Sequence, residues 1–342
     1  MRGRKFRTLA AALAALAGGW AMAGATPAAA RMAPPAGQVA LTFDDLPALT
    51  FSTDTGDVER FIGRLRKGLV RHRLPATGFV VEGKLDDDGL KAGDKARLTR
   101  ILAQWLDAGF DLGNHSYSHG SPNALGADAY TQDIARGEVV TRGLLAARGG
   151  QLRWYRHPYL ETGATAATRD AIDGWLAAHG YGVAPVTMNA NDWEFAEPYD
   201  DAVLHGNKAR ARQIRRAYLA YTARMIDWYR EAAHAVVGRD IAYVMLLHGA
   251  RLNADCVDDL ARMLKRANLK AVPLDQAMRD PAYQAADTYA GADGIDWLER
   301  WSLALNKPMP WEDFREVPED IVADYRRIDP DQGGTTPASG GQ

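Results

Sequence analysis

The chain has 342 residues, of which 47% are hydrophobic and 25% are charged, a composition typical of a globular protein with one large domain or two modest ones. Its formal net charge of −2 at pH 7 lacks the basic bias of nucleic-acid binders, which argues against that class of partner. The single cysteine excludes an intramolecular disulfide, so the hydrophobic core must stabilise the fold.

The first thirty residues have the pattern of a secretory signal peptide. A basic start over residues 2–7 is followed by an Ala- and Leu-rich stretch over 9–23 and by small residues at 28–30 that suit cleavage. An uncleaved membrane anchor is the alternative, but the apolar stretch is shorter than the ~20 residues that a span needs. We therefore expect residues 1–30 to be removed and the mature protein to be periplasmic or secreted, without stable membrane insertion.

The pattern along the rest of the chain alternates between strands and helices. The first strand opens the stretch 39–47 and is expected to stop at Asp44, because Leu46-Pro47 cannot continue a paired strand. Alternation of this kind indicates parallel strands with helical crossovers, in a barrel or in an open doubly wound sheet. Further strands are expected at 76–83, 110–114, 152–155, 181–188, 241–247 and 270–273, and helices at 58–71, 98–108, 130–147, 165–179, 208–237, 257–267, 295–305 and 316–326. Residues 329–342, rich in Gly, Thr, Ser and Pro, are expected to be disordered.

Reactive polar side chains directly follow several of these predicted strands. Because the loops after parallel strands converge on one face of an α/β domain, we expect these side chains to lie close together. They are Asp44 and Asp45, His115 and His119, Arg156, Asp192 and His248. No nucleotide-binding glycine motif follows a strand, so this convergence does not indicate a nucleotide site.

The spacing His115-x-x-x-His119 allows two imidazoles to reach one metal ion, on one helical turn or in a tight loop. Alone, such a pair is more often solvated surface histidines. One carboxylate from the first strand would complete a two-His, one-carboxylate set with open metal positions, which is typical of catalytic sites. Other residues have plain structural interpretations as well: Arg156 as an exposed cation, Trp193 as a core aromatic and Tyr159 as a wall residue.

Five motifs follow one another along the chain: Thr42-Phe43-Asp44-Asp45, His115-Ser116-x-x-His119, Arg156-x-Pro158-Tyr159, Asp192-Trp193 and Leu246-Leu247-His248-Gly249. In this order they resemble the motifs of the polysaccharide deacetylases, the NodB-homology enzymes of carbohydrate esterase family 4. The resemblance implies an α/β fold, a deformed (β/α)7-type barrel with the NodB-homology topology, over residues 31–280. A helical C-terminal extension would then cover residues 281–328.

The resemblance also implies the main chemical roles. A divalent metal, zinc before cobalt or nickel, would be held by Asp45, His115 and His119. Asp44 would be the general base and His248 the general acid.

Supporting roles follow from the same resemblance. Arg156 would orient the base, and Asp192 would steady either Arg156 or His248. Tyr159 would offer its backbone N–H to an oxyanion hole, while Trp193 and Leu246 would line the acyl pocket.

The sequence departs from the family pattern at two motifs. Leu46 takes the place of a usual glycine and is followed by Pro47, so the loop beside the metal is expected to take a different path. Asn189 stands where many members have an additional Asp, which leaves Asp192 as the acid of that motif.

These observations lead to one hypothesis and two alternatives. The hypothesis is an exported metal-dependent hydrolase that removes N-acetyl, or O-acetyl, groups from an acetylated polysaccharide or oligosaccharide by metal-activated water. The first alternative is a sugar-binding protein on the same fold with impaired catalysis, suggested by Leu46-Pro47. The second is a hydrolase of small non-sugar amides, which the signal peptide disfavours.

Overall fold

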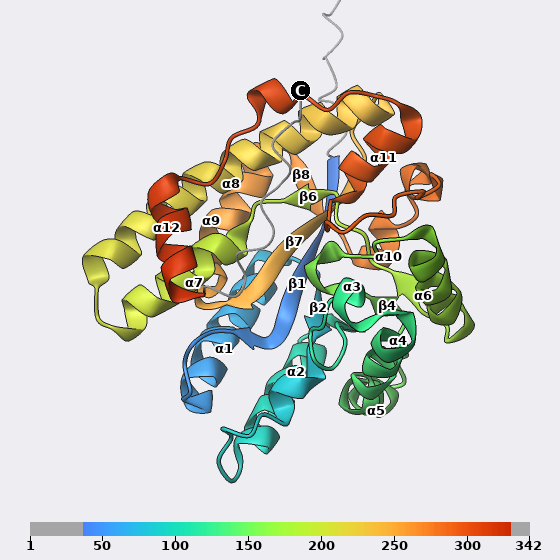
Figure 1. Cartoon of the computed structure of the whole chain (residues 1–342). Helices are drawn as coiled ribbons and strands as arrows, with labels where there is room; N and C mark the ends of the chain where they lie inside the picture. Colours follow the sequence, from blue (N-terminus) through green and yellow to red (C-terminus); the bar gives the residue numbers. More distant parts are fainter. Residues whose placement is uncertain (1–36, 330–342) are drawn as a thin grey trace, which may run out of the picture. The chain divides into compact units, whose positions relative to one another are not determined.

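The computed structural model describes residues 37–329, so the predicted signal peptide and the tail from residue 330 lie outside the described residues. A curled parallel sheet of eight strands forms the centre of this part, with helices around it (Figure 1). The strand order is β5-β4-β3-β2-β1-β7-β6, and β8 pairs with β1. This arrangement confirms the predicted α/β fold of the deformed barrel type. The strands are β1 (Gly37–Leu49), β2 (Ala76–Val80), β3 (Asp111–Asn114), β4 (Trp154–Tyr155), β5 (Gly182–Val183), β6 (Met188–Asn189), β7 (Ala242–Ala250) and β8 (Leu269–Ala271).

The predicted helices occur in the predicted order and cover the sheet with their apolar faces, and further helices that were not predicted lie over 122–125, 192–204 and 274–277. Helix α1, for example, begins after Asp54, whose side chain accepts a hydrogen bond from the Gly56 N–H, and buries Phe61 and Leu65. It packs against α9. The helices are α1 (Thr55–His72), α2 (Asp94–Asp107), α3 (Pro122–Leu125), α4 (Ala127–Arg136), α5 (Val139–Ala146), α6 (Ala166–Ala178), α7 (Asp192–Leu204), α8 (Lys208–Val237), α9 (Arg251–Arg266), α10 (Leu274–Ala277), α11 (Trp297–Leu305) and α12 (Glu319–Ile328). Short 3-10 helices occupy η1 (Glu82–Leu85), η2 (Pro158–Leu160), η3 (Pro281–Gln284) and η4 (Trp311–Asp313).

The predicted end of the first strand is wrong. Strand β1 continues through Pro47 to Leu49, and its register shifts between Asp44 and Leu49 against β7. Within this irregular part Asp45 has a φ of 67°. The shift explains how proline is tolerated, because the strand no longer needs every N–H of its ladder there.

Two other predicted elements are each divided in the structure. The expected helix over 130–147 breaks at Gly137, where an added Cβ would lie 2.3 Å from the backbone carbon of Ser116. The expected strand over 181–188 becomes β5 and β6, with Pro185 between them. These two strands pair with β4 and β7 respectively, so the segment crosses from one edge of the sheet to the other.

Leu46 fits between the neighbouring strands. Its side chain is fully buried. A Cβ added at Gly78 of β2 would lie 2.2 Å from Leu46 Cδ1, and one at Gly249 of β7 would lie 2.7 Å from Leu46 Cδ2. The absence of a side chain at Gly78 and at Gly249 therefore makes the space that Leu46 requires.

The C-terminal segment after residue 280 forms hydrogen bonds with the loop that follows β4. Arg300 of α11 is buried and donates to the Leu160 carbonyl at 2.7 Å and to Thr162 Oγ1 at 3.0 Å, while it pairs with Asp287 at 2.9 Å. A Cβ added at Gly294 would lie 1.7 Å from the Tyr159 carbonyl oxygen, so the backbones touch there. This segment is thus held against residues of the third predicted motif.

We expect Leu46→Ala to lower the free energy of unfolding by about 2–5 kcal/mol, because it removes buried methyl groups from a closely packed space. Chemical denaturation measures the change. Leu303→Ala in α11 is the matched control, since Leu303 is 61% exposed and should change stability by less than about 0.5 kcal/mol. Equal effects of the two substitutions would contradict this description of Leu46.

Candidate active site

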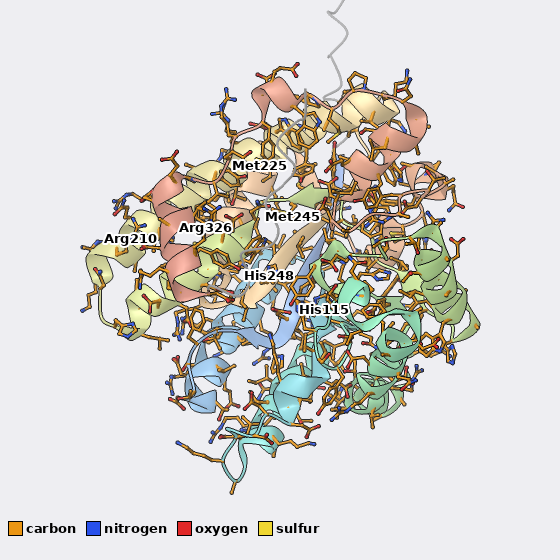
Figure 2. All side chains as sticks on the ribbon, viewed as in Figure 1. His115, Arg210, Met225, Met245, His248 and Arg326 are labelled. Carbon is orange, nitrogen blue, oxygen red and sulfur yellow. The ribbon has the colours of Figure 1, made fainter. Side chains whose placement is uncertain are left out.

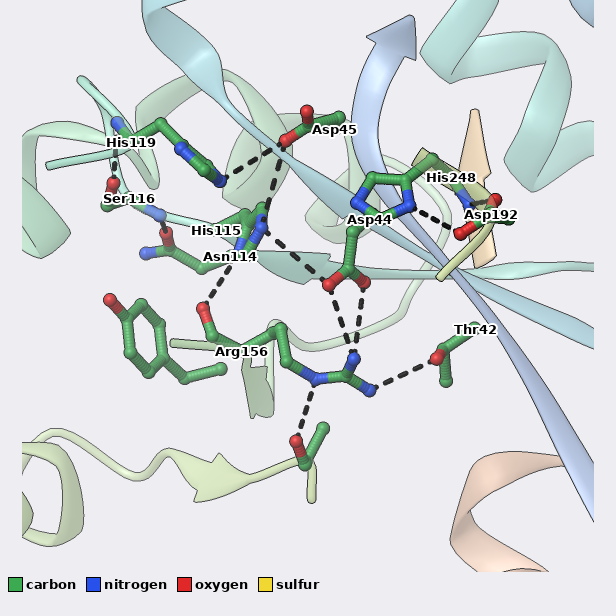
Figure 3. A network of polar contacts seen from close by, with 12 residues as sticks. Thr42, Asp44, Asp45, Asn114, His115, Ser116, His119, Arg156, Asp192 and His248 are labelled. Atoms are coloured by element: carbon green, nitrogen blue, oxygen red, sulfur yellow. Dashed lines mark hydrogen bonds and ion pairs between the residues drawn. The ribbon is translucent and has the colours of Figure 1, made fainter. Parts of the chain in front are cut away.

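Two consecutive carboxylates of β1 face the same region of the molecule. Neighbouring residues of a regular strand point to opposite faces of a sheet. The left-handed φ of Asp45 and the register shift interrupt that alternation, and both Asp44 and Asp45 join one polar network (Figure 3). Both side chains are buried.

The two histidines of the second motif come from a tight loop after β3, the second of the two geometries considered above. The Asn114 side chain accepts a hydrogen bond from the Ser116 N–H at 2.7 Å, and Ser116 Oγ accepts one from the His119 N–H at 3.0 Å. Ser116 and His119 have φ values of 65° and 55°, which coil the loop closely. The break at Gly137 leaves room for the loop backbone.

Asp45, His115 and His119 offer ligand atoms that all lie within 4.8 Å of one another. Asp45 Oδ1 is 3.5 Å from His119 Nε2 and 3.8 Å from His115 Nε2. Asp45 Oδ1 is also buried without a hydrogen-bond partner in the described part of the chain. An unpaired buried carboxylate oxygen between two imidazole nitrogens fits a divalent metal ion of the zinc type.

The protonation of the histidines suits metal binding. His115 Nδ1 lies 2.7 Å from the Arg156 carbonyl oxygen, so Nδ1 carries the proton and Nε2 keeps its lone pair facing Asp45. Burial, with the nearby His119, holds the pKa of His115 well below its usual range. Burial likewise lowers the pKa of His119. Both rings are thus neutral, the form that binds metals.

Lys84 contacts this group and was not singled out in the sequence. Its Nζ lies 3.3 Å from Asp45 Oδ2 and donates to the Asp45 and Ala48 carbonyl oxygens. Burial alone would raise the pKa of Asp45, but Lys84 and His119 outweigh burial and lower it. Lys84 occupies one carboxylate oxygen and leaves the other facing the histidines. The only feature of the sequence that points to Lys84 as a site residue is its position directly after the second predicted strand.

Arg156 is fully buried, so its interpretation as an exposed cation is wrong. Its guanidinium donates to Asp44 Oδ2 at 3.2 Å, to Thr42 Oγ1 at 3.1 Å and to the Ala184 carbonyl at 2.8 Å. It also lies 4.8 Å from the ring centre of Phe79. These contacts fix the direction of the Asp44 carboxylate. Burial raises the pKa of Asp44 to about 6, and Arg156 limits the rise.

Asp192 contacts His248, which decides between the two partners that the sequence left open. Asp192 Oδ1 is 2.8 Å from His248 Nδ1, and Asp192 Oδ2 accepts from the His248 N–H at 2.7 Å. Asn253 donates to the same Oδ2 at 2.6 Å and accepts from the Tyr218 hydroxyl at 2.7 Å. Asp192 is the first residue of helix α7, which the sequence pattern did not predict.

The carboxylate sets the charge of His248. Burial would lower the pKa of the ring, but the ionised Asp192 and the hydrogen bond it accepts outweigh burial and raise the pKa to about 9. His248 therefore carries a proton at neutral pH. In the pairing of β1 with β7, Asp44 and His248 lie directly opposite each other.

Several of these groups line a cavity of about 680 Å³. His115 and His248, both labelled in Figure 2, are among its lining residues. Leu246 and Trp193, predicted as pocket residues, also line it. Trp193 packs edge-on against Tyr325 of α12, with ring centres 5.0 Å apart.

Tyr159 lines the cavity beside the histidines. Its ring centre is 4.6 Å from that of His119, and its φ is 56°. The C-terminal segment contributes further walls, which the motifs did not predict because that segment lies outside them. The structure thus brings all ten predicted site residues to one cavity or its wall, with Arg156 and Asp192 buried just behind the lining.

Comparison with known proteins agrees with the motifs. A family model described as polysaccharide deacetylase matches residues 31–174, which confirms the family resemblance. A search of curated proteins found no match.

Within residues 37–329, none of the helices combines the length and apolar character that crossing a membrane requires.

Several solved structures are similar to this chain. A mutant of a CE4 family pseudoenzyme from Bacillus anthracis, with restored enzymatic activity, is 20% identical, with a TM-score of 0.47 over 72% of this chain and 69% of that one. A polysaccharide deacetylase from Bacillus cereus is 18% identical, with a TM-score of 0.47 over 69% and 91%. A family 4 carbohydrate esterase from Streptomyces lividans in complex with acetate is 20% identical, with a TM-score of 0.44 over 70% and 95%. At these values the likeness adds no argument about activity.

We expect His119→Ala to lower zinc affinity by more than the ~10–100-fold loss typical of removing an outer partner of a metal site, because it removes a ligand. Elemental analysis after dialysis measures the bound zinc. His205→Ala is the matched control, because the His205 side chain is 75% exposed and lies outside the cavity. Full zinc occupancy in the His119 variant would refute the ligand set.

Asp192→Asn is expected to lower the pKa of His248 from about 9 toward its usual value of 6.5, because the variant removes the charge opposite the ring. Since folding raises this pKa, the pair stabilises the fold fully below pH ~6.5 and loses its contribution as the pH rises through about 9. Titration of the ring signals by NMR in metal-free protein measures the shift. An unchanged pKa of His248 in this variant would mean that a group other than Asp192 raises it.

Proposed function

We propose that this chain, a member of the polysaccharide deacetylase family by its match over residues 31–174, removes acetyl groups from an acetylated polysaccharide or oligosaccharide. N-acetyl amides are the expected substrates, and O-acetyl esters would use the same groups. The observation that carries the proposal is a buried carboxylate oxygen of Asp45 without a hydrogen-bond partner, facing two neutral imidazoles, beside a separate base and acid. Export would follow if residues 1–30 act as a signal peptide.

Asp45, His115 and His119 would hold a divalent metal, with zinc the first expectation and cobalt or nickel next. When bound, the ion would supply Lewis-acid assistance to the attack of water on the acetyl carbonyl. The fit of the donor set supports this assignment. The remaining steps belong to residues of the chain.

Asp44 would take a proton from the attacking water. Arg156 and the packing around it hold the Asp44 carboxylate in one direction, so the base needs no reorientation during the reaction. The second carboxylate oxygen, Oδ1, lies farther from Arg156 Nη1, at 3.5 Å. The buried Arg156 thus fixes the position of Asp44, which supports the role of Asp44 as the base.

His248 would give a proton to the departing nitrogen. Its ring is charged at neutral pH because of Asp192, and the charged form is the one that donates. Asp192 also fixes the ring through Nδ1, which leaves Nε2 to face the substrate. Acetate and a free amine would then leave. Asp44 would lose its added proton to solvent, and His248 would regain a proton from solvent.

The acyl group would lie against Leu246 and Trp193, with the Tyr159 backbone N–H as the proposed oxyanion donor. The left-handed backbone at Tyr159 and Leu160 supports this assignment, because it turns the chain sharply at the wall of the cavity. Arg300 holds the Leu160 carbonyl and so secures the turn.

Release of acetate from N-acetylated sugar oligomers by the zinc-loaded protein tests the proposal. His248→Ala should slow the reaction by roughly 10²–10⁴-fold, because it removes the general acid, while zinc content stays unchanged. His205→Ala should leave both quantities unchanged. If the wild-type protein binds such oligomers but releases no acetate, it is a sugar-binding protein. If it acts only on small non-sugar amides, the polysaccharide assignment is wrong.

A further inference from the structure

Two consecutive residues of the cavity wall have an unusual backbone conformation. Tyr159 and Leu160 have φ values of 56° and 57°, in the left-handed region that residues with side chains rarely adopt. Such a conformation is unfavourable and persists only where the surrounding structure fixes it. Tyr159 carries the proposed oxyanion donor on its backbone, so the contacts that fix this turn, residues 158–163, also fix the donor.

The hydrogen bonds inside the turn do not explain its conformation. The Leu160 N–H donates to the His157 carbonyl at 3.1 Å, and the Glu161 N–H donates to the Pro158 carbonyl at 3.1 Å. Bonds of this kind are those of an ordinary short 3-10 helix, whose residues have negative φ values. The left-handed conformation therefore depends on contacts from outside the turn.

Arg300 of α11 makes several of these outside contacts. Its guanidinium donates to the Leu160 carbonyl at 2.7 Å, across 140 residues of sequence, and to Thr162 Oγ1 at 3.0 Å. The arginine side chain is fully buried and pairs with Asp287 at 2.9 Å, and its Cζ lies 4.2 Å from the ring centre of Trp297. A charged donor binds a carbonyl more strongly than a neutral one. Arg300 thus fixes the carbonyl of the second left-handed residue.

The backbone of the C-terminal segment also touches the turn directly. The Gly291 N–H donates to the Gly163 carbonyl at 3.2 Å. A Cβ added at Gly294 would lie 1.7 Å from the Tyr159 carbonyl oxygen and 2.8 Å from its carbonyl carbon, so only a residue without a side chain fits there. The Tyr159 carbonyl therefore has no room to move toward this segment.

The loop before α3 and the start of that helix hold the same parts from another direction. Asn123 Nδ2 donates to Glu161 Oε2 at 3.0 Å and to the Ala292 carbonyl at 2.9 Å. The Ser121 hydroxyl also donates to Glu161 Oε2. Asn123 therefore joins the turn to the C-terminal segment, and the two parts are fixed relative to each other.

The simpler interpretation is that these contacts only anchor the C-terminal segment to the domain. An anchor could end on any exposed carbonyl or side chain of the domain. Here the contacts of the segment concentrate on four residues of one turn, Tyr159, Leu160, Thr162 and Gly163. Two of these four are the residues with the unfavourable conformation. This concentration favours a role in holding the turn.

We propose that Arg300 is a positioning residue for the reaction, assisted by the close approach of Gly294. It holds the turn so that the Tyr159 N–H meets the oxygen that becomes negative when water attacks the acetyl carbonyl. The C-terminal segment, which lies outside the five motifs, is then part of the reacting centre. This inference rests on the proposed deacetylase function, which supplies that oxygen.

Arg300→Met and Gly294→Ala in the zinc-loaded protein test the proposal. The first variant removes the donors at similar side-chain length, and the second keeps every hydrogen-bonding group but forces a Cβ against the Tyr159 carbonyl. Each should lower kcat for acetate release from an N-acetylglucosamine tetramer about 10–100-fold and leave KM within about twofold, because a displaced oxyanion donor weakens only the transition state. Zinc content should not change.

Arg315→Met and Gly174→Ala are the matched controls. Arg315 is an exposed arginine of the same segment that also donates to backbone carbonyl groups, those of Glu312 and Phe314. A Cβ added at Gly174 of α6 would meet no atom within 4 Å. Neither control should change kcat or KM.

Hydrogen–deuterium exchange supplies a readout that needs no turnover. The amides of Leu160 and Glu161 should exchange about tenfold faster or more in both variants, because the turn opens more often once its outside contacts are weakened. Exchange in the buried part of α1 should stay unchanged, which separates this effect from a general loss of stability. If Arg300→Met does not fold, Gly294→Ala decides the question.

The other outcomes overturn the inference or the function separately. Wild-type kcat in the variants would remove Arg300 and Gly294 from the reaction, and a fall of kcat with equally faster exchange in α1 would make their role structural. A rise of KM at constant kcat would place their effect on substrate binding. If the wild-type protein releases no acetate while the variants still speed exchange at the turn, the deacetylase function alone is rejected.

Discussion

The buried side chain and carbonyl of Arg156 connect the two halves of the reacting centre. The guanidinium holds Asp44, the proposed base, and the carbonyl oxygen of the same residue fixes the tautomer of His115, a proposed metal ligand. A buried cation is costly unless it is well paired, and here a carboxylate, a hydroxyl and a backbone carbonyl satisfy it. Arg156 therefore sets the position of the proposed base relative to a proposed metal ligand. Its side chain is fully buried, so water does not compete for these contacts.

Small residues make that arrangement sterically feasible. The kink at Asp45 turns a second carboxylate toward the site, and the following Leu46 is accommodated because Gly78 and Gly249 flank it. Gly137, which also lacks a side chain, leaves room for the loop that carries His115 and His119. The glycines on the two neighbouring strands thus make room for Leu46 directly after the two carboxylates.

Much of the site could be predicted from the sequence, because the ends of parallel strands converge whatever the details of the helices. The strand ends placed Asp44, His115 and His248 together. The continuation of β1 could not be predicted, since it depends on a register shift that the pairing with β7 imposes. Lys84 was missed because a lone lysine carries no motif. The cavity wall formed by α7, α8 and the C-terminal segment was missed because these elements are distant in sequence, so only folding brings their side chains together.

The most direct measurement of the central claim is anomalous diffraction at the zinc edge from crystals of the zinc-loaded protein. The account predicts one peak within bonding distance of Asp45 Oδ1, His115 Nε2 and His119 Nε2, with Asp44 still held by Arg156. A peak bound by Asp44 and His248 instead, or an ordered site without any peak, would contradict it.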